Sequence, residues 1–141
     1  MINGSEESNF RNRNSLSNVV GLYWIVIAGV LLYVILDAIA HILPPHYSPI
    51  RDAESDLAVG PYGYIMTINF VNRGLLSLLF VYAFVKTLDL TGAKGASFRS
   101  GYYLLTGWGI GAILLAIFPT DVSPTTVSWH GAIHLVVAIV L

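Results

Sequence analysis

Two histidines and an aspartate have the types and spacing expected of a metal site. His130 and His134 are four residues apart, and Asp121 comes shortly before them. Side chains at positions i and i+4 lie on the same face of a helix, so both imidazoles can approach one cation. Three protein ligands and a water form a catalytic zinc site, in which the metal activates the water for hydrolysis. We therefore predict His130, His134 and Asp121 as metal ligands, with zinc as the candidate metal. Asp37 and His41 are alternatives to Asp121 as the third ligand.

Two further carboxylates are candidates for the general base of such a hydrolysis. Asp37 lies four residues before His41, and Asp56 lies in an acidic segment between two apolar stretches. Either carboxylate can accept a proton from a metal-bound water. Two alternatives stay open for the histidines. They can be neutral side chains that hydrogen-bond between helices, or a proton relay or pH sensor that titrates near neutral pH.

Arg73 is a charged residue inside an apolar stretch, with Asn69 four residues before it. Arginine keeps its charge, so within a membrane it must meet a carboxylate, reach the surface or line a wet cavity. The functional hypothesis is that Arg73 and Asn69 bind a substrate, with Arg73 clamping a phosphate or carboxylate head group. The structural alternative is an ion pair, for which Asp37 is a candidate partner.

The composition indicates that membrane helices position these residues. Of the 141 residues, 55% are hydrophobic and 11% are charged, whereas charged residues make up about 25% of a typical soluble domain. This balance excludes an ordinary soluble domain. The net charge of −1 argues against a nucleic-acid binder. The sequence contains no cysteine, which excludes a thiolate nucleophile and cysteine-ligated metal sites.

Four apolar segments predict an all-α fold, a polytopic bundle of transmembrane helices. A helix needs about 20 mostly apolar residues to cross a bilayer. The predicted spans cover about residues 19–43, 64–86, 101–118 and 125–141. We expect a disordered tail over residues 1–18 and one transmembrane domain over residues 19–141. The fourth span ends while still apolar, so we expect the chain to be a fragment of a longer protein.

One of these spans carries glycines at a spacing that is typical of helix packing. Gly107 and Gly111 have the small-xxx-small spacing that lets two membrane helices approach closely. We therefore predict that this face of the third span packs against a neighbouring helix.

Lysine and arginine residues predict the orientation, because they favour the cytoplasmic side. With the N-terminus in the cytoplasm, five basic residues fall on the cytoplasmic side and only Arg51 falls outside. These five are Arg11, Arg13, Lys86, Lys94 and Arg99. All four histidines and five of the eight acids then lie at the outward side, which predicts an outward-facing Asp/His cluster.

Two blocks of the sequence resemble a known family. One block runs from Tyr47-Ser48-Pro49 through Glu54-Ser55-Asp56-Leu57 and Pro61-Tyr62-Gly63-Tyr64 to Asn69-Phe70-Val71-Asn72-Arg73-Gly74; the other is Phe118-Pro119-Thr120-Asp121 followed by His130-Gly131 and His134. Together they resemble the prokaryotic membrane family catalogued as domain of unknown function 998. The resemblance implies a cell-membrane protein of about six helices, without an established activity. It also implies that Ser55, Asp56, Asp121, His130 and His134 are signature positions.

A looser similarity, of residue types only, links the chain to transmembrane hydrolases of the alkaline ceramidase type. Those enzymes also combine a serine, an aspartate and a His-x-x-x-His pair, which adds Ser55 to Asp37 and Asp56 as candidate catalytic residues. The partners expected are the lipid bilayer and a lipid head group or small anionic ligand.

Three hypotheses about function follow from the sequence. The first is a metal-dependent hydrolase of a lipid-like substrate. The second is a transporter or binding protein in which Asp37, Arg73 and the histidines form a polar or proton path. The third is a structural membrane scaffold.

Overall fold

The computed structural model describes residues 4–43, 47–92, 96–121 and 127–140. These residues form four α-helices and one short 3-10 helix, and no strand occurs among them. The elements in chain order are α1 (Gly4–Ile42), η1 (Glu54–Ala58), α2 (Gly63–Thr91), α3 (Ala96–Ile117) and α4 (Trp129–Val140). The predicted all-α fold is confirmed.

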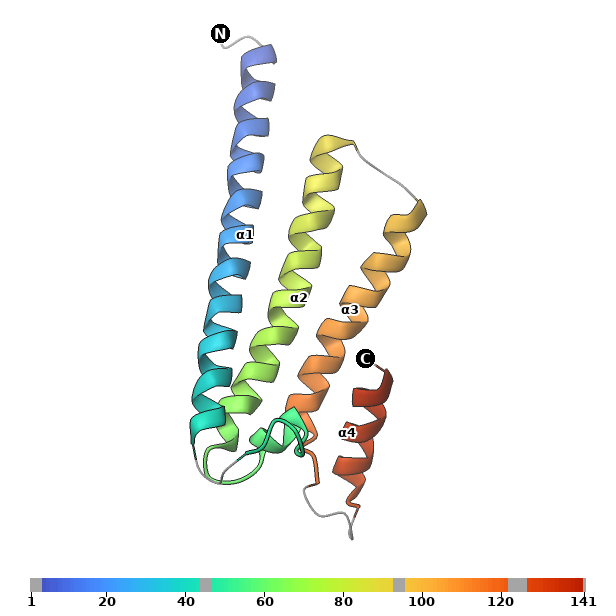
Figure 1. Ribbon diagram of the computed structural model, residues 1–141. Coiled ribbons are helices and arrows are strands. Elements are labelled where there is room, and N and C mark those ends of the chain that lie inside the picture. The colour runs from blue at the N-terminus through green and yellow to red at the C-terminus, as the bar shows by residue number, and fades with distance from the viewer. Residues whose placement is uncertain (1–3, 44–46, 93–95, 122–126, 141) are drawn as a thin grey trace.

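The central element of the bundle is α2, which packs against α1 on one side and α3 on the other (Figure 1). The short α4 packs against α3, and η1 packs against α2. In Figure 1, η1 lies at the end of the bundle where α1 and α3 end and where α2 and α4 begin. Four helices and the 3-10 helix therefore meet at this end.

In the described part of the chain, three helices are long and apolar enough to cross a membrane, and they make the chain an integral membrane protein. The candidate spans are Arg13–Ile42, Gly63–Thr91 and Phe98–Ile117, which correspond to the first three predicted spans. The shortest of them has 20 residues, which is about 30 Å at helical rise and matches a bilayer core. In the first span only 6% of the most apolar window is buried within the structure. Its apolar side chains therefore face outward from the bundle, as lipid-facing residues do.

The fourth predicted span is a short helix in the described residues. Helix α4 has 12 residues, about 18 Å, which is less than the bilayer core requires. It begins at Trp129, later than predicted. Residues 125, 126 and 141 of the predicted span lie outside the described residues.

The prediction of a disordered tail over residues 1–18 differs from the structure. Helix α1 starts at Gly4, so residues 4–18 continue the first span as a helix; residues 1–3 lie outside the described residues. The segment from Ser5 to Asn18 contains no proline or glycine to stop a helix. Adding a residue to an existing helix needs no new nucleus, so a polar segment can extend the apolar one.

Glycines and asparagines hold α2 against its two neighbours. A Cβ atom on Gly74 would lie 2.6 Å from the carbonyl oxygen of Gly109, so only glycine permits this α2–α3 contact. Gly111 is buried as predicted, but Gly107 is exposed and a Cβ there would meet nothing within 4 Å. The α3 glycine in the close contact is thus Gly109 rather than Gly107. The backbones of α2 and α3 come closest where Gly74 of α2 lies opposite Gly109.

Hydrogen bonds from α2 side chains join it to α1. Asn69 Nδ2 donates to the carbonyl oxygen of Tyr33 at 3.1 Å, and Asn72 Nδ2 donates to that of Gly29 at 3.0 Å. Because α1 buries few side chains, these bonds add directional contacts that fix how α2 lies along it.

Candidate functional site

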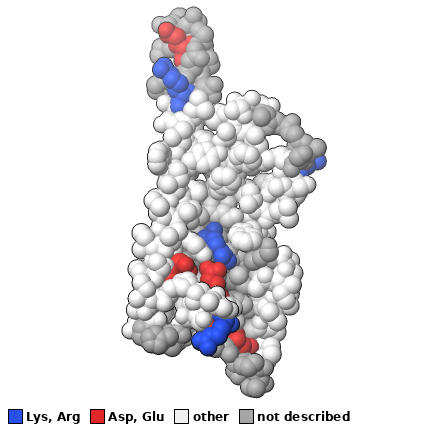
Figure 2. All heavy atoms as spheres, in the orientation of Figure 1, with Lys and Arg blue, Asp and Glu red and all other residues white. Residues whose placement is uncertain are grey.

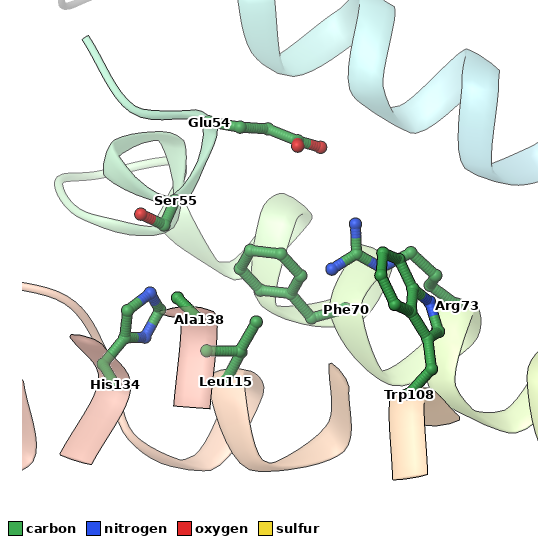
Figure 3. Close-up of a pocket in the computed structure, with 8 residues that line it drawn as sticks. All are labelled: Glu54, Ser55, Phe70, Arg73, Trp108, Leu115, His134 and Ala138. Atoms are coloured by element: carbon green, nitrogen blue, oxygen red, sulfur yellow. The ribbon is translucent and has the colours of Figure 1, made fainter. Parts of the chain in front are cut away.

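A cavity of about 240 Å³ lies between η1, α2, α3 and α4 (Figure 3). Each of these four elements contributes two residues. The lining residues are Glu54, Ser55, Phe70, Arg73, Trp108, Leu115, His134 and Ala138. In Figure 2, acidic and basic side chains lie together on the lower part of the visible face, where Figure 1 places η1. The cavity therefore lies near a group of charged side chains at the η1 end of the bundle.

Arg73 lines the cavity with its guanidinium group between two aromatic rings. Its guanidinium carbon lies 5.3 Å from the ring centre of Phe70 and 5.5 Å from that of Trp108. The Nε atom is buried and has no hydrogen-bond partner among the described residues. No carboxylate of the described residues lies within ion-pair distance of the group. Cation–π attraction to Phe70 and Trp108 thus replaces the ion pair with Asp37 that the sequence suggested as an alternative.

Asn69, which the sequence grouped with Arg73 as a substrate-binding residue, lies outside the cavity lining. The side chain is fully buried, and its amide nitrogen is used in the hydrogen bond to α1. Its Oδ1 atom is buried without a partner among the described residues. The four-residue spacing puts Asn69 one turn from Arg73, but the helix turns it toward α1 and not toward the cavity.

Glu54 is the acidic residue of the cavity, and the sequence did not single it out. Its Oε1 atom accepts a 2.7 Å hydrogen bond from the hydroxyl group of Tyr33, so α1 holds a side chain of η1. The pKa of the Tyr47 hydroxyl is raised, mainly because the group is partly buried and next because the negative charge of Glu54 lies nearby. The sequence signal was only an acid-rich loop, in which nothing distinguishes Glu54 from Asp52 or Asp56.

His134 is the one predicted metal ligand that lines the cavity. It is 3% exposed, and its Nδ1 lies 2.7 Å from the carbonyl oxygen of Phe118, a distance at which a protonated Nδ1 donates. The Nε2 atom is buried and has no partner in the described part of the chain. Figure 3 shows the ring on the η1 side of α4, below Ser55. In the tautomer in which Nδ1–H donates to the Phe118 carbonyl oxygen, Nε2 can accept a hydrogen bond from a group that enters the cavity.

Asp121 and His130 meet instead at Ser128, at the start of α4. Asp121 accepts hydrogen bonds from the Ser128 backbone N–H at 2.6 Å and from the Ser128 hydroxyl at 2.9 Å. The Ser128 hydroxyl oxygen in turn accepts a 3.1 Å bond from the backbone N–H of Gly131. His130 Nδ1 lies 3.4 Å from the same oxygen. This arrangement is an N-cap of α4 with a carboxylate behind it.

The predicted metal site is therefore not assembled in the described residues. No group of three His, Asp or Glu side chains in them could hold a metal ion. His134 bonds to Phe118, whereas Asp121 and His130 gather around Ser128. The i, i+4 spacing puts two imidazoles on one helix face, but it does not aim both at one point.

The predicted catalytic residues are also separated. Asp37 lies one turn from His41 on α1, whose Nδ1 is 2.8 Å from the Asp37 carbonyl oxygen and 3.5 Å from Oδ2, and Asp37 lies outside the cavity lining. Asp56 accepts a 3.1 Å bond from the backbone N–H of Ala53, within the 3-10 turn. Only Ser55 lines the cavity. The structure thus brings together Ser55, Arg73 and His134, and adds Glu54 and Trp108.

A comparison with protein families gives one match. The family model described as "Protein of unknown function (DUF998)" matches residues 26–141, a range that includes every residue lining the cavity. No curated protein and no solved structure matches the chain.

Proposed function

Because this chain belongs to the DUF998 family, whose description assigns no activity, we propose a function from the cavity itself. The protein binds an amphiphilic ligand, and an anionic group of that ligand, a phosphate or a carboxylate, contacts Arg73. This proposal is the second hypothesis from the sequence, a transporter or binding protein, in its binding form. Of the polar residues named there, it uses only those that line the cavity, Arg73 and His134.

The observation that carries the proposal is the unpaired guanidinium of Arg73. A charged side chain at membrane depth is costly, and such residues are normally paired. Arg73 has aromatic rings on its faces, a buried Nε without a partner, and no carboxylate within ion-pair distance among the described residues. An anionic group in the cavity would supply the missing charge and accept hydrogen bonds from the planar fork of donors.

The apolar part of the lining supports an amphiphilic rather than a fully polar ligand. Phe70, Leu115 and Ala138 form apolar walls, and a volume of about 240 Å³ suits a head group or the end of a chain. The orientation that the basic residues predict puts the cavity on the side of the membrane facing away from the cytoplasm. The ligand would then enter from the outer leaflet or from the exterior.

The test is the binding of decyl phosphate to the purified protein in neutral detergent, measured by isothermal titration calorimetry. We expect Arg73→Gln to weaken binding by one to two orders of magnitude, because a hydrogen bond to a charged group is worth about 1.5–3 kcal/mol. Arg51→Gln is the matched control, because Arg51 is exposed in the segment before η1 and does not line the cavity.

Two results would contradict the proposal. One is unchanged affinity of the Arg73→Gln variant, provided that it unfolds at the wild-type temperature. The other is equal loss of affinity in the Arg73→Gln and Arg51→Gln variants, which would indicate general attraction of the anion to a basic surface.

A further inference from the structure

We infer that the ligand is a zwitterion, with its anionic group at Arg73 and an ammonium group at Glu54. This inference rests on the proposed function, because it assumes that the cavity binds a ligand, and it names the chemical class of that ligand.

The first argument is that one small cavity contains two opposite charges that do not pair with each other. Arg73 comes from α2 and Glu54 from η1, and both line the same volume of about 240 Å³. The two side chains form no ion pair. In Figure 3 the side chains of Glu54 and Arg73 extend into the cavity from opposite sides. A ligand with one charge of each sign would fill that space and contact both groups.

The second argument is that each charge is held in place separately. The Tyr33 hydroxyl on α1 donates to Glu54 at 2.7 Å. Arg73 is held at 5.3 Å and 5.5 Å from the centres of two rings, one on its own helix and one on α3. These contacts keep the two charges apart before a ligand arrives. A site arranged in this way loses little free energy to reorganisation on binding.

The third argument is the net charge of the lining. Apart from His134, the lining contains one basic side chain, Arg73, and one acidic side chain, Glu54. A ligand with only an anionic group would gain from Arg73 and be repelled by Glu54, and a ligand with only a cationic group would meet the reverse. A zwitterion is attracted by both. The hydroxyl of Ser55 and the Nε2 atom of His134 line the same cavity and add a donor and an acceptor for other polar atoms of the ligand.

A short linker between a phosphate or carboxylate and an amine occurs both in lipid head groups and in small soluble molecules. The test therefore uses three probes, each titrated against the full chain in neutral detergent. These are decylphosphoethanolamine, decyl phosphate and soluble phosphoethanolamine. We expect wild-type protein to bind decylphosphoethanolamine about tenfold more tightly than decyl phosphate, the equivalent of one charge-assisted hydrogen bond.

Variants at Glu54 decide whether the ammonium is recognised. We expect Glu54→Gln to weaken binding of decylphosphoethanolamine about tenfold and not to weaken binding of decyl phosphate. Asp56→Asn is the matched control on the same 3-10 helix, since an amide oxygen can still accept the bond from Ala53. Tyr33→Phe keeps the charge of Glu54 and removes the hydroxyl that holds it, so we expect a smaller loss in the same direction.

The outcomes separate this inference from the proposed function. If Glu54→Gln and Tyr33→Phe bind both decyl probes as wild type does, while Arg73→Gln still binds decyl phosphate weakly, the zwitterion is wrong and the anion site stands. If wild-type protein binds none of the three probes, both proposals are wrong. Phosphoethanolamine binding as tightly as decylphosphoethanolamine supports a soluble zwitterion, and much weaker binding supports a lipid head group.

Discussion

Replacing Asp121 with alanine should lower the stability of the protein through the start of α4. The carboxylate accepts two hydrogen bonds from Ser128, at 2.6 Å from the backbone N–H and at 2.9 Å from the hydroxyl. Hydrogen bonds to a charged group contribute about 1.5–3 kcal/mol each. After alanine substitution the hydroxyl can still bond to water. We therefore expect a total loss of about 3 kcal/mol, which lowers the unfolding temperature by about 6–12 °C for a chain of this size.

Asparagine at the same position separates hydrogen bonding from charge. An asparagine oxygen can still accept the bond from the Ser128 N–H, and its amide can donate to the Ser128 hydroxyl oxygen. We therefore expect Asp121→Asn to lose about 1 kcal/mol, well short of the alanine variant. Glu6→Gln, at an exposed position near the start of α1, is the control and should unfold as wild type does.

The assay is thermal unfolding in neutral detergent, followed by intrinsic tryptophan fluorescence. Trp129 is the first residue of α4, so the signal includes the helix whose start is perturbed. The reasoning is refuted if Asp121→Ala unfolds at the wild-type temperature, or if Asp121→Asn is destabilised as much as Asp121→Ala. The metal-ligand hypothesis makes a different prediction, in which zinc raises the unfolding temperature of the wild type and not of either variant.

Three further predictions concern helix packing and orientation. Gly74→Ala should destabilise the protein by about 1–3 kcal/mol in the same unfolding assay, since the added Cβ meets the Gly109 carbonyl oxygen at 2.6 Å; Gly107→Ala, which meets nothing, should not, and equal effects would contradict the close approach. Asn69→Ala should cost about 1–2 kcal/mol through the lost bond to α1, so an unchanged unfolding temperature would count against that contact. Asp52→Cys, in a sequence without cysteine, should react with a membrane-impermeant maleimide only from outside the cell, and labelling only from the cytoplasmic side would reverse the predicted orientation.

Residue types and local spacing drew attention to some residues that line the cavity, but they did not predict where each side chain points. Arg73 stood out because an arginine in an apolar stretch is expensive wherever the chain folds. The same reasoning marked the pair His130 and His134, yet only His134 lines the cavity, since each imidazole is turned by a different partner. Nothing in the sequence marked Trp108, whose role depends on which turn of α3 lies opposite Arg73.

The sequence by itself determined that this protein is a helical membrane protein, and three long apolar helices of the described residues overlap the first three predicted spans. Whether a helix can cross a membrane depends on the total apolar content of about 20 consecutive residues. It does not depend on where any one side chain points. Only the tertiary structure decided that Glu54 and Arg73 line the same cavity and that Asp121 bonds to Ser128, the N-cap of α4. These contacts join residues that are not neighbours in the chain, and their geometry is set by how η1, α2, α3 and α4 pack around one another.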